Sequence, residues 1–186
     1  MTIKLDLGCG VAPLKDHVGV DQHLLPSVDL VADLEAALPF RTNSVDGIYS
    51  KSVLEHLDRF EFVMAEIHRV LKPGAVIHIR VPHFSSPLSF SDFTHKRFFG
   101  YYTFDYLVPI SEQKSPRKVP EHYTTFKFRI LSKRLHFVSY FPPMMAFYWL
   151  FEKLVNSSEW LALFYESTLC YLLPCYSIEI SLTPAK

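Results

Sequence analysis

The first part of the chain repeats one pattern, in which a short apolar run ends in a polar residue or a glycine. The runs span residues 3–7, 18–20 and 28–32. The first is followed by Gly8, the second by Asp21 and the third by Asp33. Short apolar runs bounded by turn residues predict buried parallel strands. Ligands bind at the carboxyl ends of such strands, so these residues predict a ligand-binding edge of a sheet.

The same patterning continues through the rest of the chain and predicts an alternating α/β fold. A helix from residue 58 or 59 to 71 is predicted from apolar residues at helical spacing, and Pro73-Gly74 should end it. Further strands are predicted over 47–50, 76–81, part of 124–131 with a restart at 136–140, and 175–182. Helices are predicted over 143–156 and 159–172. We expect one domain over 1–186, made of a cofactor-binding half (1–84), an acceptor-side lid or insert (85–121) and C-terminal strands and aromatic helices (122–186).

The connections between the first strands are too short for helices. Residues 8–17 join the first two strands, whereas a parallel crossover usually needs about a dozen residues or more. Residues 22–27, before the third strand, are fewer still. The first crossover helices should therefore be shortened or missing, which would leave one sheet face partly bare. We expect the aromatic C-terminal helices, or a second copy of the chain, to cover that face.

Five segments in order carry a family resemblance. They read LDLGCG at 5–10, ADL at 32–34, VDGIYS at 45–50, VLEHL at 53–57 and VLKPGA at 70–75. Together they resemble the class I S-adenosylmethionine-dependent methyltransferases, most closely the small branch often called type 11. The resemblance covers residues 3 to about 84. It implies a Rossmann-like, mostly parallel sheet of about seven strands with the last antiparallel, and S-adenosyl-L-methionine as cofactor. The usual third glycine of the turn is Ala12 here.

The resemblance also implies which residues hold the cofactor. A carboxylate can accept both ribose hydroxyls, and Asp21 occupies the position of that acid. Asp33 matches the position beside the adenine, and Ser50 the methionine pocket. The full expected set is Asp6, Gly8, Cys9, Gly10, Asp21, Gln22, Asp33, Leu34, Ser50 and His56. The alternatives are a solvated turn acid at Asp21, a cap at Asp33 and an acid bonded to nearby backbone at Asp6.

Three histidines are candidates for catalysis: His56, His83 and His95. Imidazole titrates near neutral pH and can act as a base for an oxygen or nitrogen acceptor. His56 could instead pack beside the cofactor. His95, with the Lys96 and Arg97 that follow, could grip an anionic or hydroxylated acceptor, or form a solvated surface. A metal site from His83, Asp92 and His95 is conceivable, but no close ligand motif supports it and we expect no metal.

Composition narrows the partners. Lys and Arg together number 19, as do Asp and Glu, so the formal charge is zero, which argues against broad binding of nucleic acid. Cys9, Cys170 and Cys175 show no metal-ligand spacing, and no signal segment opens the chain, so we expect a cytoplasmic protein. The apolar stretch 144–151 is too short for a transmembrane segment. It is apolar all round, which fits a buried core or lid helix, a homodimer contact or, least well, a peripheral membrane surface.

The expected function is methyl transfer from S-adenosylmethionine to a small-molecule, glycan-like or lipid-like acceptor. The alternative is a non-catalytic S-adenosylmethionine-binding scaffold or regulatory partner. A nicotinamide oxidoreductase is disfavoured, because residues 8–12 read Gly-x-Gly-x-Ala without the Gly-x-Gly-x-x-Gly spacing of dinucleotide-binding turns.

Overall fold

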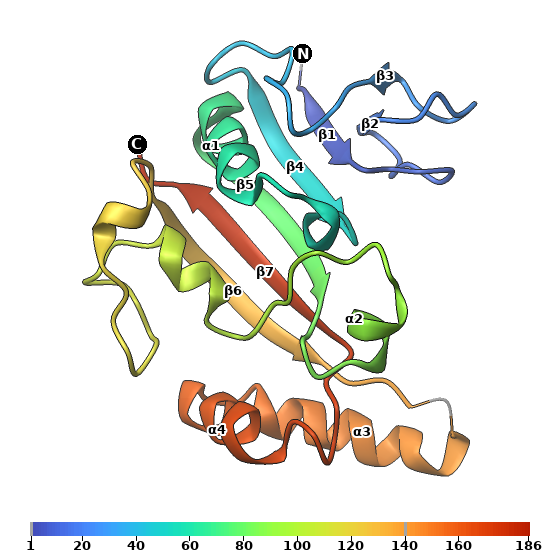
Figure 1. The fold of residues 1–186 in the computed structure, drawn as a ribbon, viewed down its shortest axis with the longest axis vertical. Coiled ribbons are helices and arrows are strands. Elements are labelled where there is room, and N and C mark those ends of the chain that lie inside the picture. The colour runs from blue at the N-terminus through green and yellow to red at the C-terminus, as the bar shows by residue number, and fades with distance from the viewer. Residues whose placement is uncertain (1, 140) are drawn as a thin grey trace.

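A single seven-stranded sheet organises the molecule (Figure 1). The computed structural model describes residues 2–139 and 141–186. The strand order is β3-β2-β1-β4-β5-β7-β6. The strands are β1 (Lys4–Leu7), β2 (Val18–Asp21), β3 (Leu30–Val31), β4 (Val45–Lys51), β5 (Leu71–Pro82), β6 (Phe128–His136) and β7 (Ser177–Pro184). Strands β1 to β5 pair in parallel, and β7 runs antiparallel between β5 and β6. The Rossmann-like sheet with an antiparallel last strand is therefore confirmed.

The predicted strands all exist, with shifted ends. The strand predicted at 76–81 begins at Leu71, directly after helix α1 (Phe60–Val70), so the helix ends before Pro73-Gly74 and not at that pair. Strand β6 begins later and runs further than expected, because a register shift between Ile130 and Ser132 lets it continue beside β7. Of the predicted restart at 136–140, His136 closes β6, and residue 140 lies outside the described residues.

Helix α1 packs one face against the sheet. Its buried apolar residues, Val63, Met64, Ile67 and Val70, are fully covered and join the core formed by β1, β4 and β5. Their spacing at three and four residues places them on one stripe of the helix. This contact fixes the position of the turn at Leu54–His56, which precedes the helix and leads directly from β4.

The first crossover has no helix among residues 8–17, as expected from its length. Side chains from β1 and from the loop before β3 hold it instead. The Asp6 carboxylate accepts a hydrogen bond from the Leu14 N–H at 2.8 Å, and the Ser27 hydroxyl donates to the Gly10 carbonyl at 3.0 Å. Because these bonds satisfy backbone groups that a helix would have paired, the loop can stay compact without one.

Residues 85–121, called the insert below, have little regular structure. They contain the short helix α2 (Pro87–Ser91) and a 3₁₀ turn at Thr103–Leu107, and a second such turn, Glu121–Tyr123, begins at the insert's last residue. The insert is nevertheless well packed, since Phe99 and Phe104 are buried and stack with their ring centroids 5.7 Å apart. Figure 1 shows the insert crossing in front of the sheet, on the same side as α1.

The aromatic helices do not lie where the sequence suggested. Helix α3 (Pro142–Val155) packs beside β6, and α4 (Glu159–Phe164), which continues as a π-helical turn through Leu169, packs on α3 (Figure 1). Both are at the end of the molecule away from β2 and β3, so the expectation that they cover that face is wrong. Val155 is the buried residue of α3, and Trp149 is 57% exposed, so the expected core helix is also wrong.

No helix in the described parts of the chain has the length and apolarity needed to span a membrane.

Candidate active site

The carboxyl ends of β1, β2 and β4 meet around Gly8. This residue adopts a positive φ of 68°, and a Cβ placed there would lie 2.2 Å from Cγ2 of Val53. Its N–H donates to the Val20 carbonyl at 2.8 Å, which ties the turn to β2. Glycine is required here both for the backbone angle and for the close approach of Val53.

Asp21 at the end of β2 organises the loop from two sides. Its Oδ2 accepts the Gly10 N–H at 3.0 Å and its Oδ1 accepts the His23 N–H at 2.9 Å. Burial opposes ionisation, but the hydrogen bonds from His23 and Gly10 outweigh it, so the pKa of Asp21 lies below its ordinary value. A carboxylate has about four lone-pair positions, and those that remain can accept hydroxyl groups of a ligand.

A cavity of about 290 Å³, called the strand-end cavity, opens beside these residues. Its lining includes most of the expected cofactor set, namely Gly8, Asp21, Gln22, Asp33, Leu34 and His56. Further lining residues were not in the expected cofactor set: His23, Glu35, Ser52, Val53, Leu57 and Lys96. Val53 and Leu57 belong to the VLEHL segment, and the others apart from Lys96 lie beside an expected residue or segment, so widening each motif by one or two positions would have found them. Lys96 comes from the insert, where the sequence marked it only as a possible acceptor contact.

The other expected cofactor residues are not part of the lining of this cavity. Asp6 is 5% exposed and bonds the loop backbone, as in the alternative reading of that residue, and burial raises the pKa of its carboxyl group. Ser50 is buried, and its hydroxyl has no hydrogen-bond partner among the described residues. Cys9 and Gly10 are part of the loop that Asp21 holds. These residues support the lining and do not form it.

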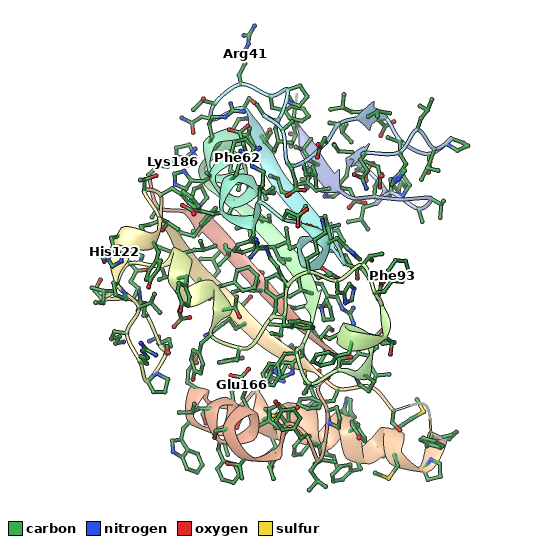
Figure 2. The ribbon with its side chains drawn as sticks, in the orientation of Figure 1. Arg41, Phe62, Phe93, His122, Glu166 and Lys186 are labelled. Atoms are coloured by element: carbon green, nitrogen blue, oxygen red, sulfur yellow. The ribbon has the colours of Figure 1, made fainter. Side chains whose placement is uncertain are left out.

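A larger cavity of about 650 Å³ adjoins the first and is called the insert cavity. The two share Ser52 and His56 in their linings. Its walls come from the ends of β4 and β5, from the insert and from the start of β7: Lys51, Glu55, Arg80, Val81, Pro82, Leu88, Ser91, Asp92, Phe93, His95, Tyr176 and Ser177. Figure 2 shows Phe93, one of these lining residues, at the edge of the molecule, and it is 96% exposed.

The insert is tied to the turn that follows β4. The N–H groups of Lys96 and Arg97 both donate to the Glu55 carbonyl, at 2.8 and 3.1 Å. The Arg97 guanidinium donates to the Leu57 carbonyl at 2.8 Å and to that of Asp58, while the Lys96 ammonium pairs with the Asp58 carboxylate. The two cations that could have gripped an acceptor are therefore engaged in holding the insert in place.

His56 and His95 lie together at the junction of the cavities, with ring centroids 4.8 Å apart. Nδ1 of His56 is 2.9 Å from the Thr94 hydroxyl, and that hydroxyl donates to the Asp92 carboxylate at 2.6 Å. The bonds from Thr94 hold the pKa of Asp92 below its usual value, so this carboxylate cannot supply the proton. Because the hydroxyl has one hydrogen, His56 must donate through Nδ1, which leaves a lone pair on Nε2.

Glu55 lies at the same junction, beside His56 and His95. It is 1% exposed, and burial raises the pKa of its carboxyl group to about 7. Oε2 has no hydrogen-bond partner among the described residues. A buried carboxyl oxygen without a hydrogen-bond partner is costly, so its presence beside two histidines marks the position as chemically specialised.

His83 is placed differently from the other two candidates. It is fully buried, with Nδ1 2.8 Å from the Ser85 hydroxyl and Nε2 3.1 Å from the Glu166 carboxylate. Neither cavity includes it in its lining. Figure 2 shows Glu166 near the C-terminal helices, so this pair links the end of β5 to the π-helical turn. His83 therefore has a structural position, and both of its ring nitrogens are occupied.

The fold defines a class of protein. Over 98% of this chain, the structure is similar to a methyltransferase of Archaeoglobus fulgidus described as S-adenosylmethionine-dependent, with a TM-score of 0.55, 16% identity and coverage of 86% of that chain. A chain of the complex between the Haloferax volcanii Trm112 methyltransferase activator and its candidate methyltransferase gives 0.56, 13% identity and coverage of 98% and 82%. The YcgJ protein of Bacillus subtilis gives 0.50, 16% and coverage of 98% and 89%. At these identities the likeness establishes the methyltransferase fold.

The sequence adds the family. Residues 5–79 match the family described as "Methyltransferase domain", of the type 11 branch. Residues 5–79 thus carry the pattern of a class I S-adenosylmethionine-dependent methyltransferase domain, whose family cofactor is S-adenosyl-L-methionine. A further match, 51% identical over 39 residues, is to 24-methylenesterol C-methyltransferase 2 of Arabidopsis thaliana. It spans 21% of this chain and 11% of the length of that relative.

The strand-end cavity fits this cofactor. Glycine at position 8 avoids the clash that a Cβ would make with Val53. The Asp21 carboxylate is held in place by two backbone N–H groups, and its remaining lone pairs can accept hydrogen bonds from a ligand. At about 290 Å³, the strand-end cavity is close to the lower end of the range of about 300 to 1,000 Å³ that small-ligand sites usually occupy. The residues present can therefore hold S-adenosylmethionine.

Proposed function

We propose that this protein transfers the methyl group of S-adenosylmethionine to a small acceptor bound in the insert cavity. The observation that carries the proposal is that the two cavities meet at Ser52 and His56. A donor in one and an acceptor in the other would then be held side by side, and such positioning supplies much of the catalysis of a displacement reaction. When bound, the cofactor supplies an activated methyl carbon.

The residues of the strand-end cavity and those at the junction have separate roles. Asp21 and the loop that it orders bind the ribose, Asp33 and Leu34 lie beside the adenine, and Gly8 lets the backbone approach. His56 contacts both ligands, and its Nε2 lone pair is available at the reacting end. Loss of His56 should therefore affect turnover more than cofactor binding.

The walls of the insert cavity favour a small, hydroxylated or anionic acceptor with an apolar part. Lys51 supplies positive charge, whereas Arg80 is already paired with Glu179 at 3.4 Å. Val81, Leu88 and Phe93 supply apolar surface. Polar groups placed in a partly apolar cavity are typical of sites for small molecules. This composition of the cavity is consistent with a small metabolite, a glycan-like unit or the polar end of a lipid-like molecule.

The first test is calorimetric titration with S-adenosylhomocysteine, with NADH as the control ligand. We expect micromolar binding of S-adenosylhomocysteine alone. Asp21→Asn should weaken it about 10- to 100-fold, because hydrogen bonds to a charged group contribute about 1.5 to 3 kcal/mol. The matched control is Glu61→Gln, which removes the same charge from an exposed position on α1 and should leave binding unchanged.

An acceptor screen then separates an enzyme from a scaffold. Small hydroxylated, carboxylated and lipid-like molecules are incubated with S-adenosylmethionine, and released S-adenosylhomocysteine is measured. Turnover with any class establishes the enzyme. Tight cofactor binding without turnover across the panel would favour the scaffold or regulatory alternative, and absence of cofactor binding would overturn both.

A further inference from the structure

Three metal-ligating side chains converge at the junction of the two cavities. Glu55, His56 and His95 each offer one ligand atom, and these atoms all lie within 4.8 Å of one another. Glu55 and His56 come from the turn that follows β4, and His95 comes from the insert. The two segments are held in register by the backbone bonds from Lys96 and Arg97 to the Glu55 carbonyl. The cluster therefore lies on a fixed frame.

Both imidazoles are oriented by their other nitrogen. His56 donates through Nδ1 to the Thr94 hydroxyl at 2.9 Å, as the proton count above requires. Nδ1 of His95 is 3.1 Å from the Ser89 carbonyl oxygen, which can only accept, so this nitrogen is also the donor. Each neutral ring then keeps its lone pair on Nε2. Histidines that bind metals almost always donate their second ring N–H to a protein oxygen in this way.

The carboxylate supplies a second, independent observation. Glu55 is 1% exposed, and its Oε2 has no hydrogen-bond partner among the described residues. Buried carboxylates are normally paired, hydrogen-bonded or bound to a cation. The N–H groups of Val53 and Glu55 itself act on the carboxyl group, but they leave Oε2 without a partner, and the imidazole lone pairs beside it cannot donate. A cation between these three groups would satisfy the carboxylate and both lone pairs at once.

We propose that Glu55, His56 and His95 form a binding site for one divalent transition-metal ion. Two imidazoles and a carboxylate suit Zn²⁺ and related ions, and three protein ligands leave a coordination position open. Glu55, His56 and His95 all line the insert cavity, so the open position belongs to the acceptor side. This inference replaces the expectation from the sequence that no metal is bound.

A bound metal ion would restrict the chemical classes of acceptor that fit the insert cavity. If the proposed methyl transfer holds, the open position would take an oxygen of the acceptor, which favours hydroxyl- or carboxylate-bearing molecules over amines and purely apolar ones. In that case the lone pair on Nε2 of His56 binds the metal ion, and His56 does not act as a base. This consequence rests on the proposed function, whereas metal binding itself does not.

The test is titration of the metal-free protein with Zn²⁺ by calorimetry, and with Co²⁺ by visible absorption. We expect one equivalent of Zn²⁺ to bind and Co²⁺ to give the absorption of a site with fewer than six ligands. His95→Ala and Glu55→Gln should each weaken Zn²⁺ binding at least about 100-fold. Far-UV circular dichroism and S-adenosylhomocysteine binding, which should both persist, show that the variants are folded.

Two variants make the assignment specific. Thr94→Val removes the acceptor that orients His56 without touching a ligand, and it should weaken Zn²⁺ binding about 10- to 100-fold. His122→Ala removes an exposed histidine that lies on the opposite side of the molecule from Phe93, and it should change nothing (Figure 2).

The outcomes are distinct. Absence of saturable Zn²⁺ binding, or binding that His95→Ala leaves unchanged, would overturn the metal site. Zn²⁺ binding that follows these variants in a protein that does not bind S-adenosylhomocysteine would keep the metal site and overturn the proposed function instead.

Discussion

The strand-end cavity and the insert cavity share two residues but are built in different ways. Apart from Lys96, the first is lined by residues 8–57, at the ends of consecutive strands. The second is lined by residues from 51 to 177, contributed by β4, β5, the insert and β7. A site made from successive strand ends leaves a local pattern in the sequence, because each strand carries its own polar residue. A site made from distant segments leaves none.

The C-terminal half is held by the same kind of distant contact. Lys133 of β6 is 2% exposed, lies 3.5 Å from the fully buried carboxylate of Asp105 and sits over the rings of Tyr101 and Tyr102. Burial lowers the pKa of Lys133, and the negative charges of Asp105 and Glu159 oppose this effect. One buried pair thus fixes the insert to the sheet, whereas a chain of loop hydrogen bonds fixes the glycine turn.

The largest expected effect tests the junction itself. His56→Ala should lower methyl transfer about 100- to 10,000-fold, the range for loss of a group that acts directly at the reacting end. Binding of S-adenosylhomocysteine should change little, because Asp21 and the loop remain. The measurement is release of S-adenosylhomocysteine with the acceptor found in the screen, alongside calorimetry of the same variant.

The control for the half-buried His56 is His83, which is fully buried. His83→Ala should lower the free energy of unfolding by about 2 to 4 kcal/mol, since it removes a packed ring and leaves Glu166 with the Tyr101 N–H but without its imidazole partner. Turnover per folded molecule should be unchanged. If His83→Ala lowered turnover as much as His56→Ala does, the assignment of a structural role to His83 and a role at the reacting end to His56 would be wrong.

The next effect concerns how the insert is attached. Lys133→Met should lower the free energy of unfolding by about 3 to 5 kcal/mol, because it leaves Asp105 buried without its cation. The matched control, Arg129→Met, removes an exposed pair with Glu112 and should cost less than about 1 kcal/mol. Urea unfolding measures both. If both variants lowered the free energy of unfolding by similar amounts, the buried pair of Lys133 and Asp105 would not be the main attachment of the insert.

A smaller effect separates the two glycines of the turn. Gly8→Ala should lower the free energy of unfolding by about 2 to 3 kcal/mol, because it adds a clash with Val53 to the strain of a positive φ. Gly10 also has a positive φ, of 55°, but nothing lies within 4 Å of a Cβ placed there, so Gly10→Ala should cost about 1 kcal/mol. Both variants are read by thermal unfolding and by titration with S-adenosylhomocysteine, and equal effects would mean that the approach of Val53 is unimportant.

The smallest effect on stability belongs to the exposed face of α3. Leu150 and Leu154 are 59% and 57% exposed, so Leu150→Asp with Leu154→Asp should change the free energy of unfolding by less than about 1 kcal/mol. If this face joins two copies of the chain, as the sequence suggested, sedimentation should show a dimer that the double variant converts to a monomer. A protein that sediments as a monomer from the start would reject that contact.

Much of the fold followed from local patterns. The alternation of short apolar runs and polar ends predicted β1 to β4, and the helical spacing predicted α1, because each pattern is set by neighbours within one or two turns. The length of residues 8–17 was enough to predict a crossover without a helix. The errors were at element ends and in β6, where pairing with β7 decided how far the strand extends.

The amino-acid sequence alone determined the class of sheet, the resemblance to the methyltransferase family and half of the lining of the strand-end cavity, since these depend on motifs that lie within short stretches. It also identified His56, His83 and His95 as candidates without distinguishing them. Only the tertiary structure decided that His83 is enclosed by Ser85 and Glu166, that His95 lies beside His56, and that α3 and α4 are far from the bare edge of the sheet. The physical reason is that these positions depend on contacts between residues far apart in the chain, and no local pattern of hydrophobicity encodes which distant surfaces meet.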